Sequence, residues 1–235
     1  MALLVENTDE YFQSAAYSIV IEPDDADGLE HTAYITFAEP LPPIFAIRIG
    51  EALYQLRSVL DHTVMMLSDV SPTSRETEFV IAKSAESFEA MRYRLSKISS
   101  SEARSFIDAV QPFREARGLA DSPLWVLHEL FMADKHRRLL LTQAGSYGSR
   151  RLPIYPWVRT ISFVSGALRT DATGRAVLAN LTLLEPQPSI DLDVRPMLTV
   201  AFADEPVATD RIALDVLDEA LRFTAFVVGQ LCRYL

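Results

Sequence analysis

Apolar residues recur every three or four positions in three long stretches of the chain, a spacing that predicts amphipathic helices. The first stretch covers about residues 44–68, with apolar side chains at positions 49, 53, 56, 60, 64 and 67. The second covers about residues 122–138 and is apolar on almost all sides, which predicts a buried central helix. The third covers about residues 209–234. These three helices are expected to form the centre of a bundle.

Two shorter helices are expected between the first two long ones. Ser84 suits the N-cap of a helix over residues 84–98. Ser99 and Glu102 have the spacing of a capping box and would open a helix that Pro112 ends. About five helices are therefore expected in all.

Alternating and β-branched residues predict strands on both sides of this helical part. Residues 15–22 and 32–38 flank a turn-forming stretch and predict a β-hairpin. Later strands are expected in four segments, which are 138–145, 158–168, 175–184 and 192–203. The fold class is therefore α+β, with a helical bundle of about five helices and an antiparallel β-sheet formed by the N-terminal hairpin and the late strands.

We expect one domain over residues 1–235, because this length and 49% hydrophobic residues suffice for one core. It would contain a hairpin (about 15–38), a helical part (about 44–138), a β segment (about 138–203) and a C-terminal helix (about 209–234). No apolar run is long enough for a membrane span, and the N-terminus does not have the pattern of a secretory signal. The single cysteine, Cys232, excludes an internal disulfide and fits a cytoplasmic protein.

Charge is distributed unevenly along the chain. A net charge of −10 argues against a general nucleic-acid binder. The segment from Lys135 to Thr170, however, contains basic residues and no acidic one. This segment would either contact a small anion or an acidic protein partner, or be a solvated hairpin whose cations pair with acidic neighbours.

Two polar insertions in the apolar helices are the candidate site. They are "LRSVLDH" at 56–62 and "HELFMADKHRR" at 128–138. Arg57 and Asp61 are four residues apart on one helix face and can pair, whereas His62 lies about 140° around the helix from Arg57. The candidate catalytic residues are Arg57, Asp61, His62, Asp134, Lys135 and His136, and the candidate anion-binding residues are Arg137 and Arg138.

Three interpretations of these residues stay open. In the first, Arg57, Asp61, Asp134 and Lys135 form a structural network, since buried charges must be paired. In the second, His62 or His136 transfers a proton, an aspartate orients it, and Arg57 or Lys135 stabilises an anionic oxygen. The third is a metal-dependent hydrolase whose candidate ligands are His62, His128, Glu129, Asp134 and His136. No strict metal motif and no glycine-rich phosphate loop is present, so no cofactor is expected.

The two insertions resemble an uncharacterised family of bacterial and phage proteins. Its members carry one helix similar to "LRSxLDH" and a later helix that ends in "DKHR". The resemblance covers residues 50–67 and 122–141 best, and it implies no established activity.

The spacing of Arg57 and His62 also resembles the R-x(4–6)-H motif of the HEPN superfamily, helical domains of toxin–antitoxin and phage-defence systems. That resemblance implies metal-independent RNA cleavage, with His62 as acid and base and Arg57 holding the phosphate. It also implies a homodimer, because active HEPN sites usually form across two chains. The alternative is a non-catalytic binding or interaction protein whose polar cluster is structural.

Overall fold

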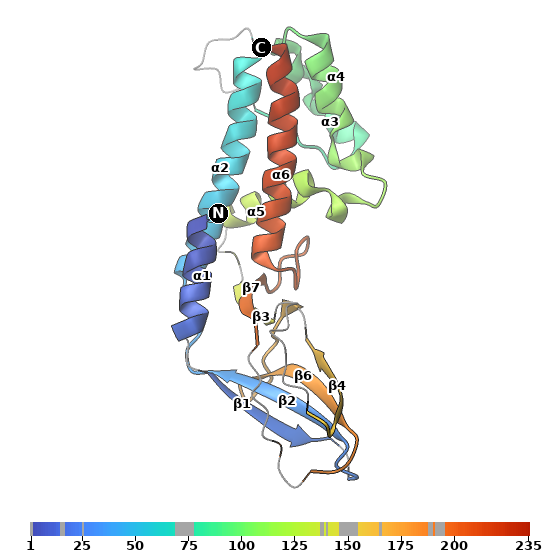
Figure 1. Ribbon diagram of the computed structural model, residues 1–235. Helices are drawn as coiled ribbons and strands as arrows, with labels where there is room; N and C mark the ends of the chain where they lie inside the picture. Colours follow the sequence, from blue (N-terminus) through green and yellow to red (C-terminus); the bar gives the residue numbers. More distant parts are fainter. Residues whose placement is uncertain are drawn as a thin grey trace. The chain divides into compact units, whose positions relative to one another are not determined.

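The computed structural model describes residues 2–14, 17–24, 26–68, 78–136, 139, 141–145, 155–164, 166–187, 190 and 196–235. The chain divides into two compact units (Figure 1). One comprises Met1–Phe45, Leu140–Asp204 and Thr209–Leu214, and the other comprises Ala46–Leu139, Glu205–Ala208 and Asp215–Leu235. That the two units fold together as one domain stays a prediction.

The expected α+β class is confirmed. The described helices are α1 (Ala2–Ser14), α2 (Ile44–Met66), α3 (Ala85–Met91), α4 (Ser101–Ala109), α5 (Pro123–His136) and α6 (Ala213–Leu231). Short 3-10 turns are η1 (Arg92–Lys97), η2 (Pro112–Arg114), η3 (Leu119–Asp121) and η4 (Cys232–Tyr234). The strands are β1 (Tyr17–Pro23), β2 (Glu30–Phe37), β3 (Leu141–Gly145), β4 (Val158–Phe163), β5 (Gly166–Ala167), β6 (Arg175–Leu183) and β7 (Leu198–Phe202).

The first unit holds the strands, which form two antiparallel sheets. The expected pairing of the N-terminal hairpin with a late strand is confirmed, because the larger sheet has the order β1-β2-β6-β4. Inward-facing residues of β2 and β6, such as Ala33 and Leu181, form its core. The remaining strands form a separate sheet of order β5-β3-β7. The late strands therefore divide between two sheets, where the sequence pattern suggested one.

Helix α1 was not expected from the sequence. Its stretch mixes polar and apolar residues, and its mean hydropathy is lower than that of α2 and α5. In the first unit α1 lies against β7, and the ring of Tyr11 packs edge-on against Phe45 with 5.4 Å between centroids. Tertiary contacts of this kind outweigh intrinsic propensity, which is a weak prior for a single segment.

The second unit holds most of the helices. Ser84 is the N-cap of α3, as expected, and its hydroxyl accepts from the Ser87 N–H at 3.1 Å. The cap of α4 is Ser100 and not Ser99, so that prediction was wrong by one residue. Of the helices that the structure describes, none is long and apolar enough to cross a membrane.

Helices α2 and α5 approach each other closely at Gly50. A Cβ atom at this position would collide with the carboxylate of Asp134. One turn further along α2, the rings of Tyr54 and Phe131 pack with 6.3 Å between centroids. Only glycine leaves space for the Asp134 side chain at this crossing.

Two helical glycines should therefore respond oppositely to alanine. Gly50→Ala should destabilise the protein by about 1–2 kcal/mol, because the new methyl displaces Asp134. Gly229→Ala in α6 should stabilise it by about 0.5–1 kcal/mol, since no described atom outside the adjoining helix backbone lies within 4 Å of the added carbon. Urea denaturation of both variants measures the difference. An equal response of the two would contradict the close approach.

Candidate functional site

Helix α2 places Arg57 on its buried face. Leu53 and Leu60 precede and follow it by one turn and are fully buried in the helical unit. Arg57 itself is only 8% exposed. A charge at this depth must be paired by neighbouring groups or it is very costly.

The partners of Arg57 are Asp61 and the backbone of Phe79. Its Nη2 donates to the Phe79 carbonyl at 2.7 Å and lies 2.8 Å from the Asp61 carboxylate, and its Nε donates to that carboxylate at 3.2 Å. The Phe79 N–H donates to Asp61 Oδ1 at 2.8 Å. Both backbone groups of Phe79 are thus satisfied by side chains of α2.

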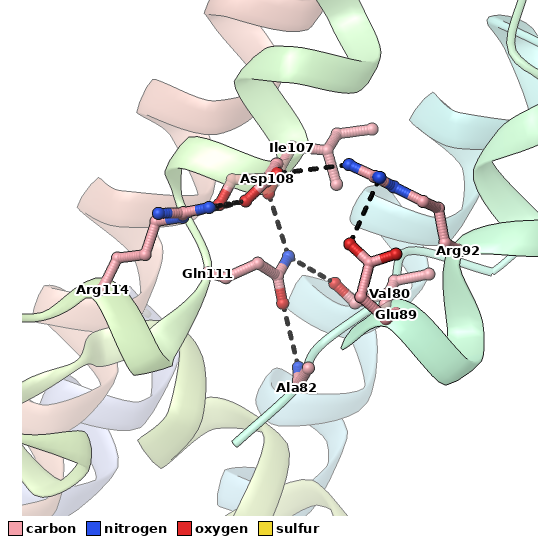
Figure 2. A network of polar contacts seen from close by, with 8 residues as sticks. All are labelled: Val80, Ala82, Glu89, Arg92, Ile107, Asp108, Gln111 and Arg114. Carbon is pink, nitrogen blue, oxygen red and sulfur yellow. Dashed lines mark hydrogen bonds and ion pairs between the residues drawn. The ribbon is translucent and has the colours of Figure 1, made fainter. Parts of the chain in front are cut away.

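Gln111, just after α4, satisfies backbone groups of the residues that follow Phe79. Its Oε1 accepts from the Ala82 N–H at 2.9 Å, and its Nε2 donates to the Val80 carbonyl at 2.8 Å and to the Ile107 carbonyl at 3.0 Å (Figure 2). The side chains of Phe79–Ala82 are buried. Side chains from two helical elements therefore give this segment the hydrogen bonds that a neighbouring strand would otherwise supply.

A pocket of about 360 Å³ opens beside this held segment. Its lining includes residues 78–83 together with Arg57, Arg94, Trp125 and His128. The rings of Trp125 and His128, one turn apart on α5, lie 5.6 Å apart and are tilted by 40°. Arg94 pairs with Glu78 at 2.9 Å on the same pocket.

Two residues of the pocket lining each have a buried side-chain nitrogen without a partner within the described chain. The two nitrogens are Nη1 of Arg57 and Nδ1 of His128. Arg57 thus uses Nε and Nη2 to hold Phe79 and Asp61 and keeps one guanidinium nitrogen uncommitted. Buried polar groups are nearly always hydrogen-bonded in folded proteins, so two unpartnered nitrogens on residues that line one pocket are unusual.

Burial governs the ionisation of the groups around the pocket. Burial, and then the nearby Arg57, lowers the pKa of His128 from 6.5 to about 4. The imidazole is therefore neutral at pH 7. Burial also raises the pKa of Asp61, and this effect outweighs the lowering by Arg57 and by the Phe79 N–H.

The structure keeps Arg57 and Asp61 together but separates them from His62. The imidazole of His62 is on the exposed face of α2, as expected from its rotation of about 140° from Arg57. Arg57 instead faces the segment that begins at Glu78. On one chain, the guanidinium and this imidazole therefore point to different surroundings.

The three candidates at the end of α5 lie elsewhere again. Asp134 is half-buried beside Gly50. Gly50 precedes Arg57 by seven residues on α2, so the two positions are about 10 Å apart along this helix. Burial raises the pKa of the Asp134 carboxyl. Lys135 and His136 are exposed. In the described chain, the six candidate catalytic residues do not form one cluster.

The remaining candidates have mixed outcomes. Arg137 and Arg138 lie outside the described residues. No group of three or more His, Cys, Asp or Glu side chains among the described residues is arranged to hold a metal ion. The candidate ligands His62 and His136 are exposed, whereas His128 and Glu129 are half-buried.

The basic segment of residues 135–170 shows cation pairing where it is described. Arg169 forms an ion pair with Asp210 at 3.0 Å and lies 3.8 Å from Asp204. The rings of Tyr155 and Trp157 pack on each other with 5.3 Å between centroids. These contacts favour a hairpin whose Arg169 has acidic neighbours.

Most residues of the pocket and of the wall behind it were not singled out from the sequence, and His128 was named only as a candidate metal ligand. Trp125 and His128 are spaced by three on α5, which could have indicated a shared face. Lys83 and Arg94 had no distinctive pattern. Gln111 sits between a helix and Pro112 in an ordinary helix-ending sequence, and only the fold brings it to residues 80–82.

Gln111→Ala should be strongly destabilising. It leaves the buried Val80 carbonyl and Ala82 N–H unpaired, which costs about 2–5 kcal/mol in the free energy of unfolding. The matched control is Gln55→Ala on the exposed face of α2, which should change stability by less than about 0.5 kcal/mol. Urea midpoints measure both, and a loss of similar size in the two variants would contradict the role assigned to Gln111.

His128 should make stability depend on pH. The unfolded chain binds a proton near pH 6.5 and the folded chain only near pH 4, so the stabilisation by neutral His128 is lost as pH falls between these values. Asp61 and Asp134 have raised pKa values, so their contribution to the free energy of unfolding increases as pH falls. This opposite contribution is present in every variant. His128→Gln should therefore lose less stability than wild type between pH 7 and 5.

Chemical denaturation at several pH values tests this prediction. His62→Gln, at the exposed histidine of α2, is the control and should follow the wild-type curve. Parallel curves for wild type and His128→Gln would show that His128 does not titrate as the buried site requires.

Comparisons with known proteins add no family to this geometry. No family model matches the sequence, and no curated protein or solved structure matches it significantly. The resemblances to the "LRSxLDH … DKHR" family and to the HEPN superfamily thus stay expectations.

Proposed function

We propose that this protein is a non-catalytic binding protein that holds a small molecule in the pocket beside residues 78–83. The observation that carries the proposal is that two residues lining one pocket, Arg57 and His128, each have a buried nitrogen, Nη1 and Nδ1, without a partner in the described chain. A polar ligand group that hydrogen-bonds to them would satisfy groups that the fold buries at a cost.

The size and the rigidity of the pocket support this proposal. A volume of about 360 Å³ lies in the range of small-molecule sites. Its wall is held in place from two sides, by Arg57 with Asp61 and by Gln111. A preorganised wall reduces the ordering cost of binding.

RNA cleavage by Arg57 and His62 is less well supported by these positions. The guanidinium is engaged with Phe79 and Asp61, while the imidazole is exposed on another side of α2. A phosphate held by Arg57 would therefore not meet His62 of the same chain. A homodimer, an RNA partner and an acidic protein partner at residues 135–170 stay predictions from the sequence.

Trp125 offers a direct test of ligand binding. The chain has two tryptophans, and Trp157→Phe leaves Trp125 at the pocket as the sole reporter. Titration of this variant with anionic, neutral and cationic aromatic fragments should give a saturable fluorescence change for at least one fragment. The expected dissociation constants are micromolar to millimolar, about −8 to −4 kcal/mol.

Trp125→Phe, which keeps Trp157, is the control and should show no saturable change with the same fragments. Absence of a response to every fragment, with a folded Trp157→Phe variant, would contradict the proposed function. Cleavage of single-stranded RNA in EDTA by wild type, but not by His62→Ala, would favour the catalytic alternative instead.

A further inference from the structure

The charges around the pocket do not cancel. Arg57 is balanced by Asp61, and Arg94 by Glu78. Lys83, on the pocket lining, forms no ion pair within the part of the chain that the structure describes. The surroundings therefore carry one uncompensated positive charge, although the whole protein has a net charge of −10.

The two unpartnered atoms can both donate a hydrogen bond. Nη1 of Arg57 is always a donor, because a guanidinium cannot accept. The neutral imidazole of His128 carries its proton on either nitrogen, so the tautomer protonated at Nδ1 presents a second donor. Two donors beside a net positive charge match an acceptor with several lone pairs, such as an ionised carboxylate.

The rest of the lining is suited to an apolar body. Trp125 and Met91 are half-buried at the pocket, and the buried segment Phe79–Ala82 also belongs to its lining. An aromatic or branched group attached to the carboxylate would contact the Trp125 ring and the Met91 thioether.

We infer that the pocket takes a small organic monoanion, with its carboxylate between Arg57 and His128 and its apolar body against Trp125. This inference rests on the proposed binding function and specifies its ligand class. Arg57 is held by Asp61 and Phe79 in a fixed orientation, so the anion meets a guanidinium that is already ordered. Lys83 supplies the compensating charge at the rim.

Benzoate, benzamide and benzylamine share a phenyl group and differ in the charge of the head group. Their relative affinities therefore report the effect of that charge. Fluorescence titration of Trp157→Phe, excited at 295 nm so that the probes absorb little, should show benzoate binding about tenfold or more tighter than benzamide. Benzylamine should bind more weakly than both. The preference for benzoate should decrease as salt is added.

Two lysine variants test whether the preference for benzoate comes from a charge at the pocket. Lys83→Gln should weaken benzoate binding about threefold or more and leave benzamide unchanged. The matched control is Lys97→Gln, which removes the same charge from an exposed position of η1 outside the pocket lining and should leave both affinities unchanged. Retention of a native urea midpoint in both variants excludes unfolding as the cause.

The outcomes distinguish the two proposals. If benzamide or benzylamine binds at Trp125 as tightly as benzoate, the pocket is a ligand site but the monoanion inference is wrong. If Lys83→Gln and Lys97→Gln weaken benzoate equally, the effect is one of overall charge and the assignment to the pocket is wrong. If no fragment of any charge binds, the proposed function itself fails.

Discussion

The second unit depends on how a buried extended segment obtains its backbone hydrogen bonds. Residues 79–82 lie among helices, with apolar side chains that favour burial. Burial of their N–H and C=O groups without partners would cost about 1–3 kcal/mol for each group. Asp61 and Arg57 satisfy Phe79, while Gln111 satisfies Val80 and Ala82. The polar residues of the helices are thus required by the polar backbone of the segment.

This constraint explains why an ion pair lies inside an apolar helix. A buried ion pair is often no more stable than apolar residues of the same volume. Here leucine at position 57 would leave the Phe79 carbonyl unpaired, and alanine at position 61 would leave its N–H unpaired. Lysine at position 57 could contact one acceptor strongly, but it lacks the planar group that binds Asp61 and Phe79 together. The residues of "LRSVLDH" are therefore first of all structural.

The sequence predicted the helices better than the polar contacts. Periodicity located α2, α5 and α6, and alternation located the hairpin that joins β6, because these signals are local. It missed α1, whose helix is supported by β7, and it did not separate the two sheets. The pairing of Arg57 with Asp61 followed from their spacing of four residues. The roles of Phe79 and Gln111 depend on contacts across 18 to 31 positions, which no local pattern encodes.

The same geometry links structure to ligand choice. A guanidinium has nitrogens on two sides, and the fold engages Nε and Nη2 in holding the segment. The third nitrogen, Nη1, is left without a partner among the described residues as a consequence of this structural role. Because His128 is neutral at pH 7 and Arg57 is paired with Asp61, the uncompensated positive charge of the pocket is that of Lys83. An anion in the pocket would hydrogen-bond to a donor that the fold has already oriented, so binding and the stability of the wall of residues 78–83 should increase together.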